Sequence, residues 1–300
     1  MKDWEIGSAG DPNADEGRRQ AALAKIAAAG GSLGGLRTIE ILEAAGCALE
    51  RRGPFNAWCE AHETFEFLTK DFVAALVTYL RGRLFRGQGF DQNRGDDGPV
   101  TILEIGAGTG RLAHFLRGKI AASRGTALPR VRVVATDSGG WALKGGGNKT
   151  EVEKVEKLGF SEALAKYQPQ IVLVSWMPMG VDWTKEIRAT SSVREYVLVG
   201  ESDDGCCGHN WLTWGNPAFR PGGAALSGDA RRTLRAADSA GTPGAPGEDH
   251  HSEGTAKAPY AEDGWERHNI RDVSRLQLSR FDSEDFVGNS CTVSFRRLSC

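Results

Sequence analysis

The chain has 300 residues, of which 40% are hydrophobic, with 37 basic and 39 acidic side chains and six cysteines. The formal net charge of −2 gives no positive field that would attract phosphates, which argues against a nucleic-acid-binding protein. Six cysteines are too few for a disulfide scaffold, no run approaches the ~20 apolar residues of a membrane span, and the start lacks the apolar stretch of a secretory signal. We therefore expect a reduced, cytoplasmic or nuclear protein with no nucleic-acid or membrane partner.

Residues 1–98 are expected to form a polar tail and a helical extension. Apolar residues at helical spacing predict helices from Ala14 to Ala29 and from Leu36 to Arg52. A third helical region, from Phe55 to Phe85, is expected to break near Thr69. Its position makes this extension a candidate lid over a site, with dimerisation and plain packing on the rest of the fold as alternatives.

From Pro99 onward the sequence changes to short apolar runs separated by helix-capable segments. Runs of this kind are typical of a parallel sheet buried on both faces, and they predict an α/β fold. Two of the intervening segments are expected to be crossover helices, at 111–121 and 161–167. The predicted strands are 100–105, 131–136, 171–176 and 196–199.

Two later segments alternate polar and apolar residues, and one long segment has few large apolar residues. The alternation at Ser274–Phe281 and Cys291–Leu298 predicts a pair of strands near the edge of the sheet. Residues 221–259 are rich in Gly, Ala, Pro and Ser, which predicts a flexible insertion with one short helix around 229–238.

The most informative segment is Glu104–Gly110, with the sequence EIGAGTG, which follows a predicted strand and opens a predicted helix. Its glycines allow a tight turn and a close approach of a ligand to the backbone, and the helix start offers unpaired N–H groups. Dinucleotide-binding enzymes use the spacing G-x-G-x-x-G. The spacing G-x-G-x-G and the acid before it make an NAD-dependent oxidoreductase a distant alternative, and an ordinary strand-to-helix turn is the structural alternative.

With this motif the chain resembles the class I S-adenosylmethionine-dependent methyltransferase superfamily, over roughly residues 99–300. The resemblance implies a Rossmann-like, seven-stranded sheet with helices on both faces and an antiparallel last strand. It also implies that the loop wraps the methionine part of the cofactor, S-adenosyl-L-methionine, while Glu104 holds its amino group. The acid that ends the next strand, Asp137, is implied to accept the ribose hydroxyls, a task that suits a carboxylate. The loop residues implied to bind the cofactor are Gly106, Ala107, Gly108 and Gly110.

The same resemblance gives weaker expectations downstream. The third strand is expected within Val155–Phe160, with Phe160 or Ser161 near the adenine. Ser175 ends the fourth strand, where the superfamily places residues between cofactor and substrate, and it is assigned to the cofactor. Some nucleic-acid and protein-glutamine methyltransferases carry an N-P-P-Y type sequence at this place. Its absence here does not support methylation of an amino group through that motif.

Aromatic residues are concentrated after the fourth and fifth predicted strands. In an open α/β sheet, ligands bind at the edge where parallel strands end, and aromatic rings there stack on flat groups or hold cations. We expect this edge to form the substrate wall, with buried loop packing as the equally supported alternative. The residues assigned to the wall are Trp176, Met177, Trp183 and Trp211.

Titratable residues follow the fifth strand at the same edge. Glu201, Asp203 and His209 are candidates for the base that removes a proton from the acceptor, and histidine has the best-suited unperturbed pKa. A polar loop with solvated or structural side chains is the alternative. Cys206 and Cys207 lack the spacing of a zinc clip, so no metal is expected.

These observations predict methyl transfer from S-adenosylmethionine to a small-molecule acceptor. Three features favour a small acceptor: no basic face, an aromatic pocket edge and no appended recognition module. A protein methyltransferase is the nearest alternative enzyme. A non-catalytic scaffold or regulatory protein that binds S-adenosylmethionine is the alternative from another class, and the oligomeric state is open.

Overall fold

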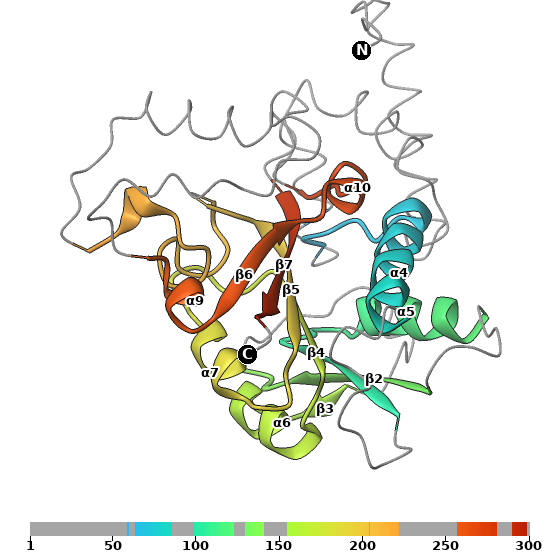
Figure 1. The fold of residues 1–300 in the computed structure, drawn as a ribbon. Coiled ribbons are helices and arrows are strands. Elements are labelled where there is room, and N and C mark those ends of the chain that lie inside the picture. The colour runs from blue at the N-terminus through green and yellow to red at the C-terminus, as the bar shows by residue number, and fades with distance from the viewer. Residues whose placement is uncertain are drawn as a thin grey trace, which may run out of the picture.

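The structure, a computed structural model, describes residue 59 and residues 64–85, 99–122, 130–140, 155–203, 205–221, 257–280 and 290–298. These residues form one seven-stranded sheet in the order β3-β2-β1-β4-β5-β7-β6 (Figure 1). The first five strands run parallel, whereas β7 is antiparallel to both β5 and β6. This confirms the expected α/β, Rossmann-like sheet of the methyltransferase type. The strands are β1 (Val100–Ile105), β2 (Val131–Asp137), β3 (Glu156–Lys157), β4 (Ile171–Ser175), β5 (Glu195–Glu201), β6 (Trp265–Asn269) and β7 (Ser290–Arg297).

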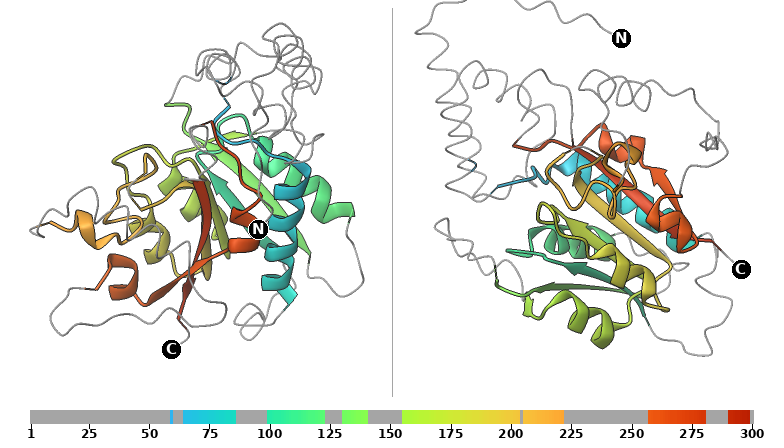
Figure 2. Two further views of the ribbon diagram at one scale, coloured as in Figure 1. Left: turned by 90° about the horizontal axis from the view of Figure 1, so that it is seen from above. Right: turned by 90° about the vertical axis from the view of Figure 1, so that its left-hand side faces the viewer.

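Helices cover both faces of the sheet, as Figures 1 and 2 show. Because successive side chains of a strand point to opposite faces, Ile102 belongs to the core cluster under one set of helices and Leu103 to the cluster under the other. The first face carries α4 (Lys70–Phe85), α5 (Arg111–Ala122) and α10 (Arg271–Ser274). The second carries α6 (Phe160–Tyr167), α7 (Thr184–Ala189) and α9 (Pro259–Glu262).

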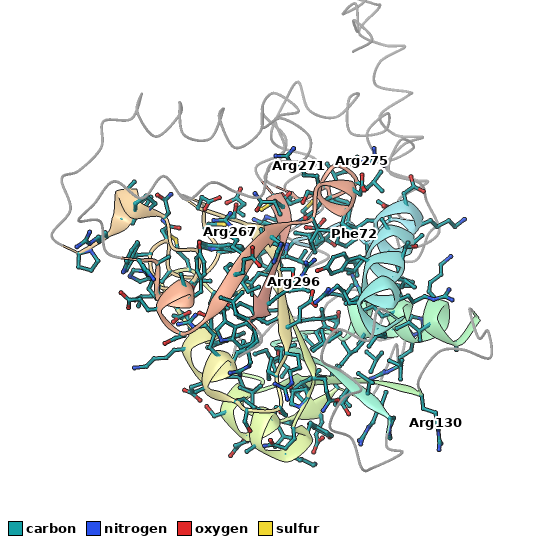
Figure 3. The ribbon with its side chains drawn as sticks, viewed as in Figure 1. Phe72, Arg130, Arg267, Arg271, Arg275 and Arg296 are labelled. Atoms are coloured by element: carbon teal, nitrogen blue, oxygen red, sulfur yellow. The ribbon has the colours of Figure 1, made fainter. Side chains whose placement is uncertain are left out.

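Helix α4 begins where the sequence predicts a break. The hydroxyl of Thr69 accepts a hydrogen bond from the backbone N–H of Phe72 at 3.1 Å, which satisfies one of the donors that a helix start leaves unpaired. Phe72 is fully buried on the side of the helix that faces the sheet (Figure 3). Residues 64–68, directly before Thr69, are not helical: Glu66 forms an isolated antiparallel bridge with Ser279.

The sheet edge corrects one prediction. Ser274–Phe281 was expected to pair with the last strand, but within the described residues it holds the end of α10, turns and the single bridge at Ser279. The partner of β7 is β6, whose register runs from Trp265 opposite Arg297 to Asn269 opposite Val293. The prediction was wrong because the apolar residues alternate in this segment although it is not a strand with one buried and one exposed face.

The third strand and the helix after it differ from expectation, whereas the ends of β1, β2, β4, β5 and β7 lie within two residues of those predicted. The third strand is only Glu156–Lys157, paired with the end of β2. Helix α6 starts at Phe160 rather than at Ser161, and the carboxylate of Glu162 accepts the N–H of its N-cap residue, Gly159, at 3.1 Å. The helices expected at 14–29 and 36–52, the short helix near 229–238 and most of the insertion at 221–259 lie outside the described residues.

Candidate active site

The carboxyl ends of β1, β2, β4 and β5 share one edge of the sheet, because these strands are parallel neighbours. The register pairs Ile105 of β1 with Val174 of β4. The next residues, Gly106 after β1 and Ser175 at the end of β4, therefore lie side by side. The glycine loop and the end of the fourth strand thus meet at this edge, where open α/β sheets bind ligands.

The glycine loop has the backbone that its spacing suggested. Gly106, Gly108 and Gly110 have φ angles of +64°, +54° and +76°, the left-handed region that residues with a Cβ rarely adopt. The N–H of Gly110 donates to the carbonyl of Ala107 at 2.8 Å, and the N–H of Ala107 donates to the carbonyl of Thr136 in β2 at 3.0 Å. The loop is therefore a tight turn fastened to the neighbouring strand.

Asp137 lies against this loop. Its Oδ2 accepts the backbone N–H of Gly108 at 2.9 Å, and its Oδ1 accepts the N–H of Gly139 at 2.7 Å. A carboxylate has about four lone-pair positions, and the side chain is half-buried. The loop and the acid that ends β2 therefore converge, and the acid has room to accept further hydrogen bonds.

Glu104 faces the start of α5 from inside the sheet. It is 2% exposed, and its Oε2 accepts the backbone N–H of Ala113 at 2.9 Å. Burial raises the pKa of Glu104 to about 8, and nearby Asp137 adds to this rise, whereas the Ala113 hydrogen bond and the charge of Arg117 oppose it. The carboxyl group therefore holds its proton at neutral pH. Its expected contact with the amino group of a cofactor stays a prediction.

Trp183, which was assigned to the substrate wall, packs directly on the glycine loop. A Cβ added at Gly106 would meet two ring carbons of Trp183 at 2.8 Å, so glycine is required here for packing as well as for its φ angle. The ring of Phe160 stacks on Trp183, with centroids 5.3 Å apart and planes inclined by 22°. Both rings pack against the core under α6 and α7, whereas Ala107 packs against the core under α5. The aromatic pair therefore covers one side of the bend, and Gly106, Ala107 and Gly108 stay half-buried.

The other residues assigned to the substrate wall divide into two kinds. Met177 and Trp211 are only 3% and 8% exposed, which leaves little of either side chain for contact with a substrate. Trp176, half-buried, follows β4 with a φ of +58°. Its indole N–H donates to Oε2 of Glu66 at 3.2 Å. Sequence reasoning missed Glu66, because nothing in its local sequence marks a residue that meets another 110 positions away.

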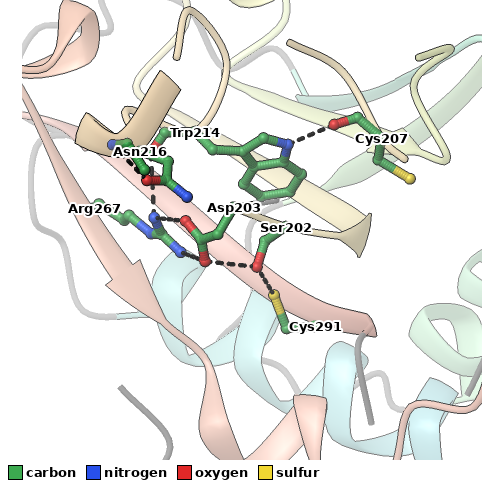
Figure 4. Close-up of polar contacts among 8 residues, drawn as sticks. Ser202, Asp203, Cys207, Trp214, Asn216, Arg267 and Cys291 are labelled. Atoms are coloured by element: carbon green, nitrogen blue, oxygen red, sulfur yellow. Dashed lines mark hydrogen bonds and ion pairs between the residues drawn. The ribbon is translucent and has the colours of Figure 1, made fainter. Parts of the chain in front are cut away.

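Asp203 is held by a half-buried ion pair (Figure 4). The guanidinium of Arg267 in β6 donates to Oδ1 at 2.7 Å and to Oδ2 at 2.9 Å, and the hydroxyl of Ser202 donates to Oδ2 at 2.8 Å. The thiol of Cys291 in β7 in turn donates to Ser202 at 3.0 Å. This network fastens the loop after β5 to the last two strands, so Asp203 has a structural use that the sequence did not reveal.

The other two candidate bases also make local contacts. Nδ1 of His209 accepts the backbone N–H groups of Trp211 at 3.2 Å and Leu212 at 3.1 Å. A neutral imidazole that accepts at Nδ1 carries its proton on Nε2, so the ring presents a donor rather than a base. Glu201, at the end of β5, is buried, and its Oε2 accepts the N–H of Cys206 at 3.0 Å. Both carboxylate oxygens of Asp203 accept hydrogen bonds. Glu201, in contrast, has a second oxygen that makes no hydrogen bond within the described residues.

Two wider properties concern the part of the chain that the structure describes. In those ranges no three or more His, Cys, Asp or Glu side chains are arranged to hold a metal ion. None of the helices there has the length and apolar character needed to cross a membrane.

Comparisons with known proteins give only distant likenesses. No protein-family model matches the chain, and no curated protein matches its sequence. Among solved structures, the ribosomal protein L11 methylase of Lactobacillus delbrueckii subsp. bulgaricus is 10% identical with a TM-score of 0.30, covering 75% of this chain and 80% of its own. The CurJ carbon methyltransferase is 11% identical with a TM-score of 0.38, covering 97% and 72%. The DszA carbon methyltransferase is 13% identical with a TM-score of 0.36, covering 75% of this chain, which spans about half of that protein at 52%.

These structures are methyltransferases by name, but the similarity is too low to carry an argument about this chain. The fold assignment rests instead on the strand order and on the antiparallel β7.

Proposed function

We propose that this protein is an S-adenosylmethionine-dependent methyltransferase with a small-molecule acceptor. The observation that carries the proposal is the hydrogen bond between the N–H of Gly108 and the carboxylate of Asp137. It brings the two elements expected to hold one nucleoside-bearing molecule to a single place. The free thiols among the described residues suit the reducing, cytoplasmic location that we propose with it.

The residues at this edge suit the parts of S-adenosylmethionine. Asp137 would accept the ribose hydroxyls with the lone pairs left over from Gly108 and Gly139. The stacked rings of Phe160 and Trp183 would provide an apolar side for the adenine. Glu104 would accept the ammonium group, a cation that favours the ionised carboxylate and so offsets the cost of burial.

When bound, the cofactor supplies an electrophilic methyl group on a sulfonium, and the chain has to align the acceptor in line with it. At the end of β4, beside the glycine loop, Ser175 would contact the cofactor and Trp176 would help to orient the acceptor. Where the acceptor carries a proton, Glu201 would remove it, because His209 and Asp203 are engaged in structural contacts. The same contacts favour the second candidate function, a non-catalytic protein that binds S-adenosylmethionine.

Calorimetric titration tests the cofactor. The protein is expected to bind S-adenosylmethionine and to bind NAD much more weakly or not at all. Asp137→Asn should weaken S-adenosylmethionine binding about tenfold, because it keeps an acceptor for Gly108 but loses the charge that strengthens hydrogen bonds from hydroxyl groups. Asp272→Asn, which changes an exposed carboxylate on α10, serves as the control and should bind like the wild type. Equal binding by Asp137→Asn and the wild type would remove the ribose assignment.

Transfer of a radiolabelled methyl group tests catalysis and the acceptor class. Label is expected in a metabolite extract. Label only in a protein extract would favour a protein methyltransferase, and binding without label in either extract would favour the scaffold.

A further inference from the structure

A carboxylate outside the expected motifs gathers three donors at the edge of the sheet. Oε2 of Glu66 accepts the indole N–H of Trp176 at 3.2 Å and the side-chain amide of Gln277 at 3.1 Å. Its Oε1 accepts the backbone N–H of Leu278 at 3.1 Å. The side chain is half-buried, and hydrogen bonds to a charged acceptor are stronger than those to a neutral one. Glu66 therefore joins the segment before α4, the end of β4 and the segment after α10.

The backbone of Glu66 is fixed as well. The N–H of Phe67 donates to the carbonyl of Leu278 at 2.9 Å, and the N–H of Arg280 donates to the carbonyl of Phe65 at 3.1 Å. These bonds flank the bridge between Glu66 and Ser279. The carboxylate thus projects from a short two-stranded ribbon rather than from a single loose segment.

Trp176 is held in a strained conformation. Its φ of +58° is unusual for a bulky side chain, and residues held in this way concentrate at binding and catalytic sites. Its backbone N–H donates to the carbonyl of Val199 at 2.8 Å, so Trp176 continues the β4–β5 pairing by one residue. The ring of Phe65 lies against the indole, with centroids 5.8 Å apart. The Arg280 guanidinium in turn lies over the Phe65 ring, 5.2 Å from its centroid.

The strained residue stands next to the proposed cofactor site. Ser175 ends β4 beside Gly106, as the register of β1 and β4 requires, and Trp176 follows it. The backbone of Trp176 therefore lies on the β4 side of the glycine loop, whereas the Trp183 ring packs on Gly106 from the α7 side. Both tryptophans lie between β4 and α7, and it is the Trp176 indole that donates to Glu66.

We propose that Glu66 is a positioning residue that holds the Trp176 indole against the methionine end of the cofactor. Residues 65–67 then form one wall of the methyl-transfer site. This inference rests on the proposed function.

The experiment measures binding of S-adenosylhomocysteine to the full chain by calorimetry. Glu66→Gln removes the charge and turns an amide NH2 group toward the donors, while Trp176→Phe keeps an aromatic ring and removes only the indole N–H. Each variant is expected to weaken binding roughly three- to tenfold. Because both changes act on the same hydrogen bond, which Glu66→Gln weakens and Trp176→Phe removes, the double variant should lose less affinity than the sum of the two single losses.

Thr69→Ala is the matched control, because it removes the cap of α4 outside this wall and should lower stability without changing the affinity. Unchanged affinity in Glu66→Gln, additive losses in the double variant, or an equal loss in Thr69→Ala would overturn the proposal. Should Glu66→Gln fail to fold, unchanged affinity in Trp176→Phe would overturn it alone. A wild-type chain that does not bind S-adenosylhomocysteine would instead refute the proposed function itself.

Discussion

Burial sets the protonation of Glu104 and gives this residue a pH signature. The folded protein holds the Glu104 proton up to a pKa of about 8, whereas the unfolded chain releases it near 4.5. Between these values the unfolded state binds fewer protons, so the free energy of unfolding falls as the pH rises. Glu104→Gln keeps an acceptor for Ala113 and removes this dependence. The free energy of unfolding of Glu104→Gln, relative to that of the wild type, should therefore rise by on the order of 3 kcal/mol between pH 5 and pH 8.

Urea denaturation at pH 5, 6.5 and 8 measures this gain. Glu262→Gln, at an exposed position at the end of α9, controls for the removal of a carboxyl group and should follow the wild type at each pH. Parallel pH profiles for Glu104→Gln and the wild type would show that Glu104 is ionised in the folded protein at neutral pH.

At the scale of elements, α4 is fastened to the sheet by a buried acid. Glu195, at the start of β5, is fully buried. Its carboxylate accepts hydrogen bonds from the Tyr79 hydroxyl at 2.5 Å, the Arg83 guanidinium at 2.6 Å and the Ser294 hydroxyl at 2.7 Å. Burial first, and then the neighbouring Glu195 charge, raises the pKa of Tyr79 to about 12. These contacts lie at the amino end of β5, away from the candidate site, so they stabilise the fold without taking part in binding.

Glu195→Gln should lower the free energy of unfolding by about 3 kcal/mol, because the half-buried Arg83 charge loses the opposite charge of a fully buried carboxylate. Chemical denaturation measures this loss, and the affinity for S-adenosylmethionine should stay at the wild-type value. Lys166→Met breaks the exposed pair with Glu156 and should change stability far less. Similar losses in the two variants would mean that the pair with Arg83 does not anchor α4.

Strands buried on both faces could be predicted from the sequence, and the edge strand could not. All residues of β1 and β5 are buried, so each appears as a continuous apolar run. In β6 only Trp265 is buried, and no apolar pattern marks it. The misassigned segment holds two leucines around Gln277, which is itself buried because its amide bonds Glu66 and Thr292. The alternation of polar and apolar residues in this segment therefore does not correspond to one buried and one exposed face.

For the molecule as a whole, the topology decides which part of the site could be predicted. Parallel strands bring their carboxyl ends to one edge, so Gly108 and Asp137 could be expected to meet, and they do. Glu66 lies 110 residues from its partner Trp176 in the sequence, and Arg267 lies 64 residues from its partner Asp203. Only the folded chain shows that Asp203 is paired with Arg267 and that Trp176 is held by Glu66.

The central claim is that the glycine loop and Asp137 hold one nucleoside-bearing molecule. A crystal structure of the full chain with S-adenosylhomocysteine tests it most directly. The account predicts ribose hydroxyls within hydrogen-bond distance of the Asp137 carboxylate and the homocysteine part along residues 106–110, beside Trp176. A ligand bound elsewhere, with Trp183 and the loop unchanged and Asp137 contacting only Gly108 and Gly139, would contradict it.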